Sequence, residues 1–119
     1  MTSDMASMRS SAESSGTVTV PEDSAELLMD AISEVNEQPY PGYERVFTIT
    51  DVTGTWVPVY GSHPTIGEEG VISRVAEKKL EFIVKEENLK RVLQVVDEYH
   101  PYEGPGVDVI PCMGWRSYL

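Results

Sequence analysis

Few residues in this chain of 119 have types and spacing that could perform chemistry. His100 and Glu103 lie three positions apart beside prolines, and His63 lies in a glycine-rich stretch. Imidazole and carboxylate groups bind Zn²⁺ and Cu²⁺, so these three side chains are a candidate site for a divalent metal ion. In the structural alternative, His100 ends a helix and Tyr102 with Glu103 braces the turn after it. The sequence leaves both interpretations open.

The residues that could act as nucleophiles give little support for catalysis. Cys112 is the only cysteine, and a lone cysteine is most often a small buried hydrophobe. A chain with a single cysteine can form neither an intramolecular disulfide framework nor a multi-cysteine zinc site. Ser62 and His63 are adjacent in sequence, which does not by itself build a catalytic dyad. We therefore expect a protein that is not an enzyme.

The composition excludes several classes of protein. The chain has 20 Asp and Glu against 9 Lys and Arg, a net charge of −11. An acidic chain is a poor binder of nucleic acid or of anionic membranes, and nothing approaches the roughly 18 apolar residues of a membrane span. We therefore expect neither a nucleic acid nor a membrane as a partner.

The acidity is concentrated in residues 21–44, which hold seven acids and no base: Glu22, Asp23, Glu26, Asp30, Glu34, Glu37 and Glu44. This segment is either a solvated helix face or a docking surface for a basic partner.

The elements that position these residues follow from hydrophobic periodicity. Apolar residues three and four apart predict a helix over 24–36, with Asp23 as its N-cap, and a second helix over 87–100 ended by Pro101. β-branched and aromatic runs predict five strand segments: 17–21, 44–60, 71–75, 80–84 and 107–111. Within the second of these, Gly54 is predicted to form a bulge or bend. Trp115 and Tyr118 in the last eight residues are expected to pack against the fold.

The element order predicts one α+β domain. Two βαβ-type halves give a ferredoxin-like split βαβ sandwich, an antiparallel sheet with two helices on one face. Residues 1–16 are rich in Ser, Met and Ala, and are predicted to be a disordered tail before a domain over 17–119. Without the apolar stretch of a secretory signal, and with one thiol, the chain is expected in the cytoplasm.

Two long strings resemble a known family. Residues 54–70 read GTWVPVYGSHPTIGEEG and residues 98–111 read EYHPYEGPGVDVIP. They resemble the two signatures of a small PII-like family, whose module is also inserted into YqfO-type dinuclear-metal proteins. Gly104 replaces the second Glu of the H-P-Y-E-E-P signature, and Arg45 and Val46 stand where the family has His and Cys.

The resemblance implies a fold similar to PII and CutA and assembly as a homotrimer. It implies a small ligand held at subunit interfaces, with a signalling or regulatory role. A divalent metal ion is the alternative ligand, and an interaction module is a third possibility. The implied binding loop comprises Gly61, His63, Pro64, Ile66 and Gly67, and the implied signature residues are His100, Pro101, Tyr102 and Glu103.

A nucleotide is one small ligand to consider, because PII proteins bind nucleotides with Lys and Arg. The available bases are Arg45, Arg74, Lys78, Lys79, Lys85, Lys90 and Arg91. The chain has neither the phosphate-loop nor the dinucleotide-turn motif. Glu68 and Glu69 in the glycine-rich loop disfavour a phosphate bound directly there.

Overall fold

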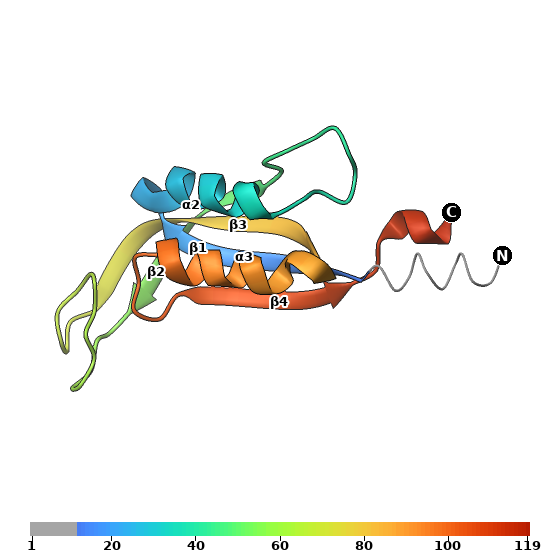
Figure 1. Cartoon of the computed structure of the whole chain (residues 1–119). Coiled ribbons are helices and arrows are strands. Elements are labelled where there is room, and N and C mark those ends of the chain that lie inside the picture. The colour runs from blue at the N-terminus through green and yellow to red at the C-terminus, as the bar shows by residue number, and fades with distance from the viewer. Residues whose placement is uncertain (1–11) are drawn as a thin grey trace.

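The computed structural model describes residues 12–119 and is built on a four-stranded antiparallel sheet (Figure 1). The chain order is β1 (Glu13–Pro21), α2 (Glu22–Val35), β2 (Thr48–Trp56), β3 (Ser73–Lys85), α3 (Glu86–Tyr99), β4 (Gly106–Cys112) and the 3₁₀ helix η1 (Trp115–Tyr118). The strands lie in the order β2-β3-β1-β4, with every neighbouring pair antiparallel. The predicted ferredoxin-like α+β sandwich is confirmed.

Both helices cover the same face of the sheet, and the core lies between the helices and the sheet (Figure 1). Successive side chains of a strand point to opposite faces, so alternate residues of β1 and β3 face the helices. The buried residues of this layer come from both sheet and helices: Val18, Val20, Leu80, Phe82, Val84, Leu28, Met29, Ile32, Val92, Val95 and Val96. Each such side chain contributes about 1.5–3 kcal/mol by leaving water.

The opposite face of the sheet has no covering layer among the described residues. Ile83 of β3 and Ile110 of β4 point to this uncovered face and remain 37% and 59% exposed. Thr19, Gly54 and Glu77 share the same face by strand register. The candidate site described below lies at one end of this face.

The β2–β3 hairpin projects past the rest of the sheet. Strand β1 pairs only with residues 77–85 of β3, whereas β2 pairs with residues 73–81. The remaining two-stranded part and its connecting loop, residues 53–76, form a hairpin arm that extends away from the helices (Figure 1). One long β3 replaces the predicted separate strands 71–75 and 80–84 because residues 76–79, three of them charged, continue the ladder with β2.

Three local predictions at the start of the chain and in β2 need correction. Strand β1 begins at Glu13, so residues 13–16 of the predicted tail belong to the sheet; residues 1–11 lie outside the described part. The N-cap of α2 is Pro21, and no side-chain hydrogen bond caps the helix there. Asp23 therefore lies in the first turn, where its negative charge interacts favourably with the positive end of the helix dipole. Gly54 makes no bulge, because the β2–β3 register runs through it without a break.

The C-terminal segment forms η1 but stays accessible. Trp115 and Tyr118 are 64% and 50% exposed. The Arg116 guanidinium lies over both the Tyr40 ring and the Trp115 ring, at 4.8 and 4.5 Å from the centroids. None of the described helices is long and apolar enough to cross a membrane.

A glycine under an aromatic ring in the core generates a stability prediction. Gly16 pairs with Phe82 across β1 and β3, and a Cβ at Gly16 would approach the Phe82 ring to 2.8 Å. The ring is 7% exposed and packs edge-on against Phe47 at 5.4 Å, so it has little room to move. We expect Gly16→Ala to lower the free energy of unfolding by about 1–3 kcal/mol, measured by denaturant unfolding.

The matched control is Gly104→Ala, where an added Cβ meets nothing within 4 Å. This control is expected to leave stability unchanged or to raise it slightly by reducing the entropy of the unfolded chain. Equal stability of the two variants would contradict the packing of Phe82 on Gly16.

Candidate functional site

The fold brings the two sequence strings together at the base of the hairpin arm. The Thr65 hydroxyl donates to the Pro101 carbonyl oxygen at 2.6 Å, and the His63 backbone N–H donates to Glu103 Oε2 at 3.0 Å. These contacts link residues 36 and 40 positions apart in the chain. Loop 57–72 is therefore fastened to the turn between α3 and β4.

A cavity of about 480 Å³ lies between the arm and this turn. Its wall includes aromatic rings, carboxylates, hydroxyls and glycines: Thr19, Gly54, Thr55, Trp56, Pro58, Ser62, Pro64, Thr65, Ile66, Glu77, Tyr102, Glu103, Gly104 and Gly106 are among its lining residues. We call it the Trp56–Tyr102 cavity. Thr19 and Glu77 place it on the uncovered face of the sheet.

Tyr102 contacts both the arm and the sheet. Its ring packs edge-on against Trp56 at 5.2 Å between centroids, and its hydroxyl donates to Glu77 Oε2 at 2.6 Å. Burial, reinforced by the hydrogen bond to Glu77 and that carboxylate's negative charge, raises the pKa of Tyr102 far above its ordinary value. The phenol therefore remains a hydrogen-bond donor throughout the physiological range.

Glu77 is a charged residue in an almost fully buried position, with 5% of its surface exposed. It stands on β3 opposite Val52 of β2 and Pro21 of β1. A Cβ added at Gly54 would conflict sterically with Glu77 Oε1, so the glycine leaves room for the carboxylate. The glycine that the sequence suggested as a bulge instead marks a close approach in the strand.

Sequence reasoning did not select Trp56, Gly54 or Glu77 as site residues. A usable signal was present for Gly54, because a glycine inside a strand marks either a bulge or a close approach. Trp56 belongs to the first string, but its position in a β-rich run is as typical of sheet packing as of a ligand contact. Nothing in the local sequence distinguishes Glu77 from the neighbouring charged residues, since its partner Tyr102 lies 25 residues away.

His100 has a structural role that uses both ring nitrogens. It is 6% exposed, and its backbone N–H donates to the Val96 carbonyl as the C-cap of α3. The Tyr102 backbone N–H donates to Nδ1 at 3.1 Å, so Nε2 carries the proton and donates to the Thr19 carbonyl at 2.7 Å. This arrangement ties the end of α3 to β1.

The predicted metal ligands His63, His100 and Glu103 do not form a metal centre here. Neither ring nitrogen of His100 is free, and His63 meets Glu103 through its backbone. Within residues 12–119, no group of three or more His, Cys, Asp or Glu side chains could hold a metal ion. Within residues 12–119 of one chain, these side chains therefore do not provide the ligand set of the divalent metal ion that their residue types predicted.

Some of the predicted loop residues line the cavity, and others determine the conformation of the loop. Pro64 and Ile66 line the cavity, and the Ile66 carbonyl accepts from the Trp56 ring N–H at 3.3 Å. Gly61 and Gly67 have φ angles of +91° and +108°, which side-chain-bearing residues rarely adopt. These two glycines shape the loop rather than touch the cavity. Pro101 contributes its carbonyl to Thr65.

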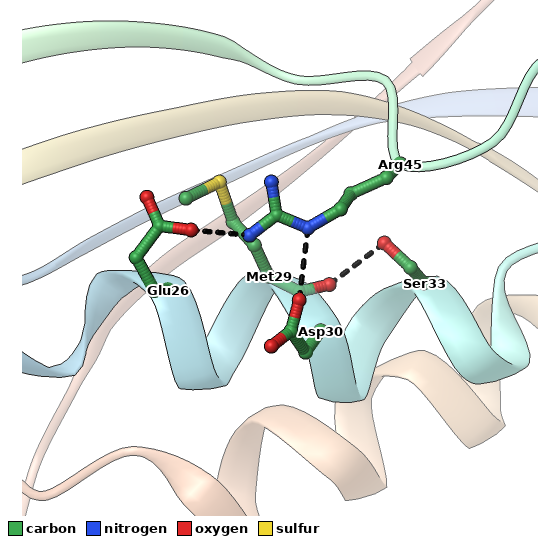
Figure 2. Close-up of polar contacts among 5 residues, drawn as sticks. All are labelled: Glu26, Met29, Asp30, Ser33 and Arg45. Carbon is green, nitrogen blue, oxygen red and sulfur yellow. Dashed lines mark hydrogen bonds and ion pairs between the residues drawn. The ribbon is translucent and has the colours of Figure 1, made fainter.

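Arg45 attaches the loop after α2 to the acidic face of that helix (Figure 2). Its guanidinium donates to Glu26 Oε2 at 2.5 Å and to Asp30 Oδ1 at 2.9 Å. These hydrogen bonds raise the pKa of Arg45 above its usual value, Glu26 contributing most. Two carboxylates of the predicted docking surface are thus already paired with a residue of the same chain.

The basic residues considered for a nucleotide lie elsewhere. None of Arg45, Arg74, Lys78, Lys79, Lys85, Lys90 and Arg91 lines the Trp56–Tyr102 cavity. Lys78 forms a hydrogen-bonded ion pair with Asp51, and this bond raises the pKa of Lys78. Lys85 pairs with Glu37 at 3.5 Å. Cys112 lines a different cavity, together with Trp115. Burial raises the pKa of the Cys112 thiol.

Comparison with known proteins finds relatives for most of the described chain. No family model matches. A "GTP cyclohydrolase 1 type 2 homolog" from Staphylococcus aureus is 34% identical over 91 residues, covering 76% of this chain and 25% of the relative. The chain thus spans about a quarter of the length of the curated relatives that it matches.

Solved structures extend the likeness to the fold. A Bacillus cereus protein related to NIF3 matches with a TM-score of 0.72 at 26% identity, covering 86% of this chain and 26% of that one. The periplasmic divalent cation tolerance protein CutA from Archaeoglobus fulgidus matches with a TM-score of 0.63 at 18% identity, covering 90% of this chain and 91% of that one. The likeness to the CutA fold is therefore confirmed.

The Tyr102–Glu77 hydrogen bond generates a pH prediction. Because the folded-state pKa of Tyr102 lies above its unfolded-state pKa, its contribution to stability is complete below about pH 10, the ordinary tyrosine value. That contribution is lost as pH rises through the raised pKa. We expect Tyr102→Phe to lower the free energy of unfolding by about 1–3 kcal/mol at pH 7, because buried Glu77 loses its donor.

The difference between wild type and Tyr102→Phe is expected to shrink above pH 10 in denaturant unfolding at several pH values. Tyr60→Phe is the control, since Tyr60 is 93% exposed, and it is expected to match wild type at every pH. A difference from wild type that is independent of pH would argue against the raised pKa.

Proposed function

We propose that this protein binds a small ligand in the Trp56–Tyr102 cavity and acts as a sensor or carrier of it. The observation that carries the proposal is the meeting of the two strings around one open cavity of about 480 Å³. That volume lies within the range of small-molecule sites, which join apolar walls to a few convergent polar groups. Trp56 and Pro58 supply apolar wall here, and Glu77 with Glu103 supplies polar groups.

We propose that the chain is the same structural module as the matching segments of the NIF3-related proteins, with a PII-like signature at residues 98–111. The 26% identity to the Bacillus cereus structure over 86% of the chain supports this. The folded unit is proposed to run from the start of β1 to residue 119. The cytoplasm remains the proposed location, on the basis of the single cysteine.

We propose a homotrimer with the ligand at subunit interfaces. The cavity opens on the uncovered sheet face, where Ile83 and Ile110 are exposed, so a second subunit packed there would border it. The arm also carries exposed apolar residues: Val57, Val59, Tyr60, Ile66, Val71 and Ile72. Large exposed apolar patches commonly mark protein–protein contacts.

The proposed role is binding rather than catalysis. The name of the Staphylococcus aureus relative refers to GTP cyclohydrolase, but this chain spans only 25% of that protein. Ser62 donates its hydroxyl to the Val59 carbonyl rather than to a histidine. Divalent cation tolerance is named for the CutA neighbour, and the engagement of both His100 nitrogens disfavours metal binding at the predicted trio.

Ligand binding is tested by a thermal-shift panel of five probes: ATP, succinate, 1,4-butanediol, putrescine and zinc chloride. A probe at a hundredfold excess over its Kd stabilises the fold by about 2.7 kcal/mol. We expect at least one probe to raise Tm of the wild type and Trp56→Leu to abolish that rise. Trp115→Leu changes the other tryptophan, outside the cavity, and is expected to keep it. No shift with any probe would count against the ligand site.

The assembly is tested by native mass spectrometry of the wild type, which is expected to be a trimer. Ile110→Glu places a charge on the uncovered face and is expected to dissociate the trimer, because burying an unpaired carboxylate is costly. Leu27→Glu is the control, because Leu27 is equally exposed at 58% but lies on α2. A monomeric wild type, or equal dissociation of both variants, would contradict the proposed interface.

A further inference from the structure

The charged groups that line the Trp56–Tyr102 cavity are of one sign. Glu77 and Glu103 are both there, and no Lys, Arg or His among residues 12–119 belongs to its lining. We propose that the ligand is a small organic cation, an ammonium or guanidinium compound; this rests on the proposal that the cavity is a ligand site. Nucleotides and other anions are then poor ligands, because two carboxylates repel them in a partly desolvated space.

The buried carboxylate is the strongest indication of the ligand's charge. Glu77 is 5% exposed, and only its Oε2 has a hydrogen-bond partner within residues 12–119, the Tyr102 hydroxyl. No described basic residue forms an ion pair with it. Its Oε1 reaches the open cavity, and a carboxylate in a largely buried residue normally has a cationic partner. A ligand N–H group within reach of the carboxylate would supply that partner.

Glu103 provides a second carboxylate at the rim of the same cavity. It is exposed, and the His63 backbone N–H holds its Oε2 at 3.0 Å. Its Oε1 has no partner in the described part of the chain. The loop thus orients one oxygen of this carboxylate and leaves the other for a ligand, so a compound with two nitrogen groups could contact both glutamates.

The aromatic walls favour an organic cation over a metal ion. Trp56 and Tyr102 both line the cavity, and aromatic faces attract ammonium and guanidinium groups through the ring quadrupole. A divalent metal instead requires several close oxygen, nitrogen or sulfur ligands. No group of three suitable side chains exists among the residues described. The cavity therefore combines charge attraction with apolar contact.

The test uses matched four-carbon probes on the full chain in the Trp115→Phe background, so that Trp56 is its only tryptophan. Putrescine is the cation, 1,4-butanediol the neutral compound and succinate the anion. Tryptophan fluorescence is titrated at moderate salt, with ATP and zinc chloride as further probes. We expect saturable binding of putrescine and none of succinate or ATP.

The variants assign the binding to the cavity. Glu77→Gln keeps the shape and an oxygen acceptor for Tyr102, and is expected to raise the Kd for putrescine about tenfold or more. Glu103→Gln is a second variant at the rim, with an effect in the same direction. Glu98→Gln makes the same change of net charge on α3, outside the cavity, and is expected to stay within about twofold of the background. Circular dichroism checks that each variant is folded.

Each other outcome overturns the inference in a distinct way. If succinate or ATP binds and putrescine does not, the cation is wrong and the ligand site stands. Zinc binding that Glu77→Gln abolishes, without putrescine binding, replaces the organic cation by a metal. Equal weakening by Glu98→Gln reduces the effect to general attraction by an acidic protein. If no probe binds, the cation inference is overturned, and the absence of any thermal shift with the same five probes counts against the ligand site as well.

Discussion

The hydrogen bond from the Tyr102 hydroxyl to Glu77 is the interaction on which the candidate site depends. It joins the turn after α3 to the middle of β3 at 2.6 Å and satisfies one oxygen of an almost fully buried carboxylate. Gly54 presents no side chain to this carboxylate and leaves room for it. Tyr102 in turn packs against Trp56, the last residue of β2. A charge that is costly to bury thus links three separate parts of the chain.

The sheet determines where this group of residues can form. Strand β3 is 13 residues long and pairs with β1 over only part of its length, so the β2–β3 hairpin continues alone beyond it. Glu77 stands where the full sheet ends and the hairpin arm begins. An isolated two-stranded hairpin is marginally stable in water. The contacts of Thr65 with Pro101 and of His63 with Glu103 therefore supply the support that β1 gives elsewhere.

The architecture was predictable from the sequence because it depends on local periodicity. The apolar stripe at Leu28 and Ile32 determines which face of α2 is buried, and the strand runs supply the opposite layer. The cap role of His100 was also among the predicted alternatives, and its N–H bond to Val96 confirms it. The long β3 was not predicted, because residues 76–79 are mostly charged and pair with β2 by backbone bonds that side-chain polarity does not indicate.

The site itself was predictable only in part. The two strings contain Pro64, Ile66, Tyr102 and Glu103, which all line the cavity. Glu77 could not be distinguished from other acids, because its burial results from contacts with residues 23 and 25 positions away.

The structure also places chemically similar acidic residues in different environments. Glu26 and Asp30 are 78% and 64% exposed at their side chains and share Arg45, so water screens them. Glu77 is only 5% exposed, and a charge in such surroundings is less screened and acts more strongly on a bound group. One buried carboxylate therefore determines the sign of the favoured ligand more than the acidic segment that dominates the net charge of −11.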